Sequence, residues 1–442
     1  MASQGQRNPS ILMLPWLAHG HLSPFLELAK RLAQRNFHIY LCSTPASLEP
    51  IRQLNLSPSI RLIEINLPSS QELPPHLHTT RVLPPHLMSA LKTAFDHAKP
   101  AFQDILKTLK PNLVIYDFLQ PWAPIVCGEE NIKSVLFLIC GAAISSYLIH
   151  YSMNPHIEYP FPSIDFPETE RQILLQMLYD VANNQTGQER YLKCVQRSSG
   201  IVLIKTSKEL EDKYIDHLSC QIKKEIVPVG PLVQDFGTKE DDGEAIIMEW
   251  LGKREPSSVV FVSFGSEYFL SKEEIEEIAH GLELSKVSFI WVVRFHAGER
   301  TRLHEVLPEG FQARVGERGM IVEGWAPQGK ILRHGSVGGF MSHCGWGSTL
   351  EGVMFGAPII AMPMHLDQPL NAKLVVEIGV GVEVRRENRR YRREEVARVV
   401  KQVVVDEEGN EVRKKVKELS QRMRERGDEE VDVVVEKLMQ LV

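Results

Sequence analysis

Several common sequence signatures are absent from this chain, and each absence excludes a class of protein. The longest hydrophobic region, residues 134–149, is interrupted by serines and is too short to cross a bilayer. The polar N-terminus leads into an apolar run at 11–17, which is typical of neither a signal peptide nor a membrane span. The six cysteines show no C-x-x-C pair and no metal-ligand spacing, so they fit free thiols in a reducing cytosol. We therefore expect a cytoplasmic protein without stable membrane insertion.

Two nucleotide-binding motifs are also missing. The chain contains no G-x-x-x-x-G-K-[ST] sequence, which excludes a P-loop. Gly345 and Gly347 begin a G-x-G-x-x-G pattern, and Asp367 follows about twenty residues later, but Leu350 occupies the third glycine position. The missing glycine argues against a nicotinamide oxidoreductase. That class remains an alternative, and a difference spectrum with NADH would test it.

Charge of one sign is not in large excess. The chain has 50 lysines and arginines against 56 aspartates and glutamates, a net charge of −6. The basic cluster at 385–394 is interleaved with acidic residues, which indicates a solvated loop and helix start. We therefore expect no nucleic-acid partner.

The chain does contain a regular alternation of strand-like and helix-like segments. Its 442 residues are too many for one ordinary core and suit two domains. Short apolar runs alternate with helical patterns before and after a polar, acidic segment at 233–245, which we interpret as a linker. This predicts an α/β fold with two doubly wound parallel sheets, whose ligand crevice lies at the carboxyl ends of the strands. We predict an N-terminal domain at 1–232, the linker at 233–245 and a second domain at 246–420. A C-terminal helix at 421–442 is expected to return to the first domain.

The stretch HCGWGSTLEG, residues 343–352, lies where a short buried strand is followed by a helix. The first N–H groups of a helix have no partners within it, and the helix dipole is positive at this end. Glycines allow a ligand to approach the backbone, and Ser348 and Thr349 add hydroxyl donors. The stretch therefore predicts a phosphate-binding site, although a glycine-rich turn that binds nothing would have a similar sequence.

Polar residues follow other predicted strands. Ser266, Trp325 with Gln328, and Asp367 with Gln368 each follow a strand of the second half. In the first half, His21 follows the strand at 11–17 and precedes Ser23 and Pro24, which we expect to form the N-cap and first position of a helix.

The segment 325–368 resembles the signature box of plant family 1 UDP-sugar-dependent glycosyltransferases. The matching positions are Trp325, Pro327, Gln328, His343, Cys344, Gly345, Trp346, Ser348, Glu351, Pro363, Asp367 and Gln368. The motifs GHLSPFLELAKRL, LVIYDFLQPWA, VPVGPL and VSFGSE agree, so the resemblance spans nearly the whole chain. The segments LPWLAHGH and FGSEYFLSKEEIEEIAHGLELS are most similar to the subgroup that adds a sugar to a sugar of a glycoside. The resemblance implies a GT-B fold, in which two facing Rossmann-like domains have the donor and acceptor cleft between them.

The resemblance also implies the roles of the donor residues. Trp325 would stack on the uracil, Gln328 would lie near the ribose or the uracil edge, and Glu351 would bind the ribose hydroxyls. Ala326 belongs to the same donor-binding set. The diphosphate would be held by Ser266, His343, Gly345, Trp346, Gly347 and Ser348, and the donor sugar by Asp367 and Gln368. Gly347 departs from the family, which commonly has asparagine there, but its backbone N–H can still bind the diphosphate. Family members with glutamine at the position of Gln368 tend to use glucose, and those with histidine tend to use galactose.

The catalytic pair that the resemblance implies is His21 with Asp117. A sugar hydroxyl is a poor nucleophile, so its transfer needs a general base. Asp117, at the end of a predicted strand, would orient the His21 ring and stabilise the imidazolium. His19 is the alternative base. No D-x-D sequence occurs, and we expect no metal, since helix dipole and donors can hold the diphosphate.

The function that these features predict is inverting transfer of glucose from UDP-glucose, a co-substrate, to a sugar hydroxyl of a flavonoid or triterpenoid glycoside. The alternatives are transfer to an aglycone hydroxyl, the same reaction with UDP-rhamnose or another UDP-sugar, and a nucleotide-sugar-binding protein without catalysis. We expect a monomer. Acceptor contacts are expected from loops such as 74–88 and 154–168, whose shapes the sequence does not define.

Overall fold

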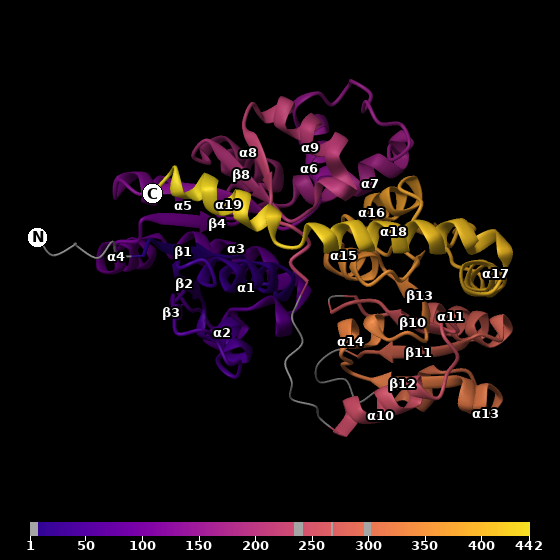
Figure 1. The fold of residues 1–442 in the computed structure, drawn as a ribbon. Helices are drawn as coiled ribbons and strands as arrows, with labels where there is room; N and C mark the ends of the chain where they lie inside the picture. The colour runs from indigo at the N-terminus through magenta and orange to yellow at the C-terminus, as the bar shows by residue number, and fades with distance from the viewer. Residues whose placement is uncertain (1–7, 234–241, 267, 296–301) are drawn as a thin grey trace, which may run out of the picture. The chain divides into compact units, whose positions relative to one another are not determined.

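The computed structural model describes residues 8–233, 242–266, 268–295 and 302–442 (Figure 1). Most of the predicted linker at 233–245 therefore lies outside the described residues. The chain divides into two compact units. The first comprises Met1–Tyr159, Glu168–Leu232 and Arg426–Val442, and the second comprises Pro160–Pro167 and Val233–Glu425.

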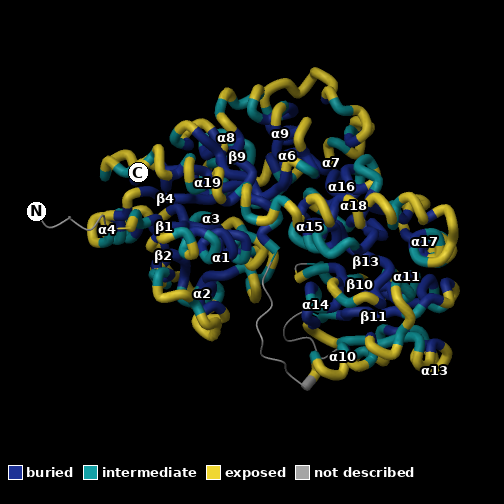
Figure 2. The backbone as a smooth tube through the Cα atoms, viewed as in Figure 1, coloured by how far each residue is buried: buried dark blue, intermediate teal, exposed yellow. Residues whose placement is uncertain are grey.

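The first unit is built on a seven-stranded parallel sheet with the order β3-β2-β1-β4-β5-β8-β9. Its strands are β1 (Ser10–Leu14), β2 (His38–Ser43), β3 (Ile60–Glu64), β4 (Leu113–Tyr116), β5 (Lys133–Leu138), β8 (Ile201–Ile204) and β9 (Glu225–Pro228). A short antiparallel pair, β6 (Val181–Ala182) and β7 (Gln185–Thr186), lies apart from this sheet. Most strand residues are buried (Figure 2), as expected for a parallel sheet covered on both faces.

Helices connect these strands, and their apolar faces cover the sheet. In α1 (His19–Ala33), buried Phe25, Leu28 and Leu32 contribute to the core together with Ile11 and Ile39 of the sheet. The other helices of the unit are α2 (Pro45–Arg52), η1 (Pro75–Leu77), η2 (Thr80–Val82), η3 (Pro85–Leu87), α3 (Met88–Asp96), α4 (Lys99–Leu109), α5 (Ala123–Glu129), α6 (Ala142–Met153), α7 (Glu168–Tyr179), α8 (Gly187–Arg197) and α9 (Lys208–Ile222).

The last helix of the chain completes the first unit. In α19 (Glu429–Met439), Val434 and Leu438 are fully buried in the core of the first sheet. Arg31 of α1 donates to Asp428, just before α19, at 2.7 Å. The sequence predicted one returning helix at 421–442, but α18 (Asn410–Arg426) extends through the first part of that range, so only the chain from Arg426 belongs to this unit.

The second unit contains a six-stranded parallel sheet with the order β12-β11-β10-β13-β14-β15. Its strands are β10 (Val259–Ser263), β11 (Ser288–Val293), β12 (Gly319–Glu323), β13 (Val337–Ser342), β14 (Ile359–Ala361) and β15 (Gly381–Glu383). Alternate residues of β10 enter two different clusters, Val260 and Val262 in one and Val259 and Phe261 in the other, so this strand is buried on both faces.

The helices of the second unit include α11 (Lys272–Ser285), which begins with a capping box: Ser271 Oγ accepts from Glu274 N at 3.2 Å, and Glu274 Oε2 accepts from Ser271 N at 2.8 Å. The others are α10 (Asp242–Gly252), α12 (Leu303–Val306), α13 (Phe311–Val315), η4 (Gly316–Arg318), α14 (Gln328–Arg333), α15 (Trp346–Met354), α16 (Gln368–Glu377), α17 (Arg393–Val404), η5 (Glu407–Gly409) and α18. Within the described residues, no helix has the length and apolarity that a membrane crossing requires.

One short segment from the first half of the sequence packs with the second unit. Residues Pro160–Pro167 lie against α16, where Lys373 Nζ donates to the carbonyl oxygen of Asp165 at 2.6 Å. The same ammonium lies 4.2 Å from the centre of the Phe166 ring. We predicted that this segment belongs to the first domain. Nothing in the local sequence indicates either of its contacts with α16.

Candidate active site

Two neighbouring strands of the first sheet bring His21 and Asp117 together. Leu14 of β1 pairs with Tyr116 of β4, so the parallel strands end at the same edge of the sheet. Asp117 follows β4 directly, and α1 begins at His19, shortly after β1. Residues 96 positions apart in the sequence therefore meet at this edge.

The pair has a defined geometry. His21 Nδ1 lies 2.8 Å from Asp117 Oδ2, which also accepts from the Trp16 N–H at 3.1 Å. Asp117 Oδ1 accepts from the Phe118 N–H at 2.7 Å. The carboxylate is fully buried, whereas the His21 side chain is 16% exposed. Because Asp117 holds Nδ1, proton exchange with a substrate would have to use Nε2.

The helix that carries His21 begins earlier than the sequence predicted. Ser23 and Pro24 were expected at the N-cap and first position, but both lie inside α1, whose N-cap is Ala18. The carbonyl oxygen of Ala18 accepts from the N–H groups of His21 and Leu22 at 3.0 and 2.9 Å, which extends the helix back. His21 is therefore in the first turn and not before it. The alternative base, His19, is exposed.

The stretch 343–352 joins β13 to α15, as predicted. Gly345 is the N-cap, and the first bond within the helix runs from Thr349 N to Gly345 O at 2.9 Å. The N–H groups of Gly347 and Ser348 precede that bond, which is the arrangement that binds anions. Cys344 has a φ of 64°, a backbone conformation that is strained for a non-glycine residue.

His343 is enclosed between two glycines. A Cβ on Gly265 would come within 2.6 Å of the His343 ring, and one on Gly345 within 2.5 Å, so both glycines are required for this packing. Burial, helped by nearby His365, lowers the pKa of His343 to about 4. The ring is therefore uncharged at neutral pH and has one N–H to donate. Its Nδ1 is buried without a hydrogen-bond partner among the described residues.

The predicted uridine-binding residues lie next to one another. Gln328 Nε2 donates to Ser348 Oγ at 3.1 Å and to Glu351 Oε2 at 2.7 Å, which connects α14 to α15. Trp325, which follows β12, is 77% exposed, whereas Ala326 is buried. Most of the Trp325 indole surface is therefore available for stacking.

Asp367 and Gln368 begin α16, and the structure shows how their side chains are held. Gln368 Oε1 accepts from the N–H groups of Met364 and His365 at 2.9 and 3.1 Å. Asp367 Oδ2 accepts from Asn371 Nδ2 at 2.8 Å. The carboxamide oxygen of Gln368 therefore closes its own loop.

Sequence reasoning missed Asn371. Its Nδ2 also donates to the carbonyl oxygen of Cys344 at 3.0 Å, which links the strained turn before α15 to the start of α16. Asp367 and Asn371 are one helical turn apart, and this spacing could have indicated the bond between their side chains.

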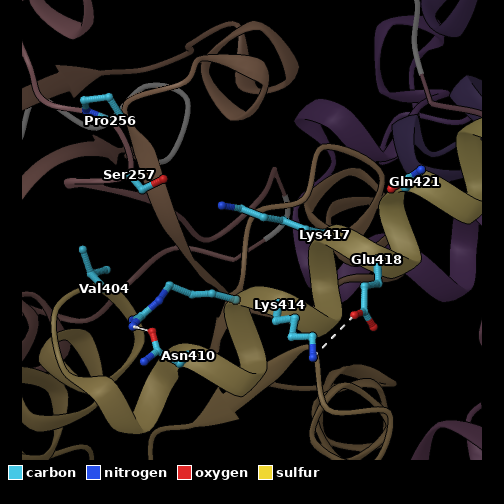
Figure 3. A pocket seen from close by; sticks show the side chains of 9 residues that line it. Pro256, Ser257, Val404, Asn410, Lys414, Lys417, Glu418 and Gln421 are labelled. Atoms are coloured by element: carbon cyan, nitrogen blue, oxygen red, sulfur yellow. Dashed lines mark hydrogen bonds and ion pairs between the residues drawn. The ribbon is translucent and has the colours of Figure 1, made fainter.

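A hollow of about 640 Å³ lies elsewhere in the second unit (Figure 3). Pro256 and Ser257 line it just before β10, whereas Ser266 follows the other end of that strand. Lys414 and Glu418 of α18 pair at 4.0 Å on its wall. The hollow is therefore at the amino end of β10 and contains none of the predicted donor residues.

Family models match both halves of the chain. A glycosyltransferase N-terminal domain model matches residues 8–234, and the UDP-glucoronosyl and UDP-glucosyl transferase family model matches 233–436. The flavanone 7-O-glucoside 2''-O-beta-L-rhamnosyltransferase of Citrus maxima is 52% identical, covering 100% of this chain and 99% of its own. The beta-D-glucosyl crocetin beta-1,6-glucosyltransferase of Gardenia jasminoides is 50% identical, covering 97% and 98%.

A solved structure shares the fold. Medicago truncatula UGT71G1 complexed with UDP-glucose superposes with a TM-score of 0.76 at 28% identity, and the match covers 95% of each chain. The two parallel-sheet, Rossmann-like domains are those of a GT-B glycosyltransferase. The chain belongs to the UDP-glucoronosyl and UDP-glucosyl transferase family and is a UDP-sugar-dependent glycosyltransferase.

Proposed function

We propose that this enzyme transfers glucose from UDP-glucose to a sugar hydroxyl of a small plant glycoside, with inversion at the anomeric carbon. The observation that carries the proposal is the His21–Asp117 pair, a buried carboxylate that holds one nitrogen of a partly exposed imidazole at 2.8 Å. That geometry suits a general base whose orientation is fixed by an acid.

In the proposed reaction, His21 Nε2 takes the proton of the acceptor hydroxyl while its oxygen attacks the anomeric carbon. The bond from that carbon to the diphosphate oxygen breaks, and its electron pair leaves with UDP. Asp117, held by three hydrogen bonds, stabilises the imidazolium that forms. A single displacement converts an α-linked donor into a β-linked product.

The proposed donor-binding residues all belong to the second unit. The N–H groups of Gly347 and Ser348 and the uncharged His343 ring would hold the diphosphate, with Ser266 and the turn at Gly345–Trp346 beside them. Trp325 and Ala326 would hold uracil, and Glu351, fixed by Gln328, would bind the ribose hydroxyls. Asp367 and Gln368 would bind the sugar.

The acceptor proposal is supported by the two relatives, since both are named as enzymes that act on an acceptor that already carries glucose. Transfer to an aglycone hydroxyl is the second candidate. Matched pairs of flavonoid or triterpenoid aglycones and their glucosides, incubated with UDP-glucose, test the choice. Products from the glucosides alone, with a new sugar-to-sugar linkage, support the proposal, and preferential use of aglycones contradicts it. We further propose a cytoplasmic monomer, which sedimentation analysis and cell fractionation would test.

Metal independence is the first prediction. Activity in excess EDTA is expected to stay within about twofold of the untreated rate, because a helix N-terminus and neutral donors can bind the diphosphate. The measurement is the initial rate with and without chelator. Loss of activity that magnesium or manganese restores would contradict the prediction.

Donor choice gives a second prediction. We expect UDP-glucose to be preferred over UDP-galactose and UDP-glucuronate by about tenfold or more in kcat/KM. The inverted hydroxyl of galactose, or the carboxylate of glucuronate in place of the C6 hydroxyl, would leave a polar partner of the site unpaired. Gln368→Glu tests the role of the Gln368 amide directly. It keeps an oxygen that accepts from the N–H groups of Met364 and His365 but removes the Nε2 donor. That variant should lose about ten- to a hundredfold in kcat/KM for UDP-glucose.

Competition between UDP-sugars on one acceptor decides the donor. If UDP-rhamnose, UDP-xylose or UDP-glucuronate is used at least tenfold more than UDP-glucose, the glucose assignment is wrong. The assignment as a glycosyltransferase would still hold. If Gln368→Glu retains the wild-type preference, Gln368 only closes its loop, and other residues select the sugar.

A further inference from the structure

Helix α8 donates to the loop that carries Asp117. Three alternate carbonyl oxygens of this loop accept from side chains of the helix. Asp117 O accepts from Cys194 Sγ at 3.7 Å, Leu119 O from Arg190 at 3.4 Å, and Pro121 O from Arg197 at 2.6 Å. The helix residues are four and three positions apart, so they lie along one face of α8.

The helix is itself held in place by a buried ion pair. Arg190 donates to both carboxylate oxygens of Asp96 at 2.9 and 2.6 Å, and the two residues are only 2% and 3% exposed. Arg190 also donates to the carbonyl oxygen of Ala182 at 2.7 Å. A buried, bidentate pair of this kind fixes orientation, because leaving either charge unpaired would be costly.

The same helix reaches the histidine through aromatic rings. The Tyr191 ring packs edge-on against Phe118 at 5.5 Å between ring centres, and the Phe118 ring lies 5.3 Å from that of His21. Helix α8 therefore contacts the residue that holds Nδ1 and, through Phe118, the imidazole itself.

We propose that Arg197 and Arg190 are positioning residues for the His21–Asp117 pair. They fix the loop 117–121, so that the Asp117 carboxylate and the Phe118 ring keep His21 at the angle needed for proton transfer. Neither arginine bonds His21 or the Asp117 side chain. The inference rests on the proposed function, because it gives these residues a purpose only if the pair is catalytic. A displacement of about 1 Å at a reacting group can reduce a rate by up to a hundredfold.

Arg197 is the residue to test, because it is exposed and its replacement removes one bond to Pro121 without leaving a buried charge unpaired. Arg197→Ala is expected to lower kcat about five- to tenfold while KM for UDP-glucose changes less than about twofold. Arg197→Lys keeps a donor and should recover part of the rate. Gln196→Ala, an exposed neighbour on the same helix, is the matched control and should behave as wild type.

A double-mutant cycle with Asp117→Asn identifies the route of the effect. If Arg197 acts through Asp117, adding Arg197→Ala to Asp117→Asn should reduce kcat by less than about twofold, which mass-spectrometric product detection can measure. Melting temperatures of all variants confirm that each is folded.

The outcomes separate the two proposals. Wild-type kcat in Arg197→Ala, or the same loss in both backgrounds, overturns the positioning role alone. If Asp117→Asn itself retains normal turnover, the catalytic pair is wrong, and a loss in Arg197→Ala would then have another cause.

Discussion

Replacing His21 by alanine is expected to lower kcat at least about a hundredfold, because the reaction loses the base that accepts the acceptor proton. The affinity for UDP should stay within about twofold of wild type, since His21 belongs to the first unit and the proposed nucleotide contacts to the second. Steady-state kinetics and calorimetric titration with UDP measure the two effects separately.

His19→Ala is the matched control, because His19 is exposed and only two positions away on the same helix. It should retain near-normal turnover. Substantial activity in His21→Ala together with a loss in His19→Ala would move the base to His19.

Replacing Asp117 by asparagine is expected to lower kcat by about three to four orders of magnitude, by analogy with the orienting acid of a catalytic triad. The carboxylate accepts from Trp16 and His21 with one oxygen and from Phe118 with the other. An amide has a single oxygen, so its NH₂ group must face an N–H donor on one side. If it faces His21, the imidazole is held in the wrong tautomer.

The same substitution leaves at least one buried donor unsatisfied, at about 1–3 kcal/mol of unfolding free energy. Kinetics should therefore be measured well below the melting temperature of the variant, and circular dichroism should show the fold intact. Near-normal turnover by a folded Asp117→Asn protein would refute the pairing.

The alternation of apolar runs and helical patterns was sufficient to predict two parallel sheets, because the buried strands of such a sheet are nearly all apolar. The strand at 259–263, for example, is buried at every residue. The strand-to-helix turn at 343–352 could be predicted from its glycines and the apolar runs on either side, and its phosphate binding stays a prediction. The pairing of His21 with Asp117 could not, since it depended on the family resemblance and on two strands being neighbours.

Other features escaped prediction for physical reasons. The bonds from α8 end on backbone carbonyl oxygens at 117, 119 and 121, and a carbonyl oxygen is present at every position of any sequence. The placement of Ser23 and Pro24 was wrong because α1 begins earlier, at bonds from His21 N and Leu22 N to the carbonyl oxygen of Ala18, which join backbone groups only. Pro24 therefore lies inside the helix, although it has no N–H to donate. The Gln368 loop contact was hidden because its partners are again backbone groups.

The return of α19 to the first sheet has a consequence for biosynthesis. Ribosomes release domains from the N-terminus onward, and an N-terminal domain ordinarily folds before the rest is made. Here Val434 and Leu438 fill part of the core that Phe25 and Ile39 begin. The first unit therefore cannot complete its core until α19 has left the ribosome, so the nascent protein carries an unfinished apolar surface throughout the synthesis of its second unit.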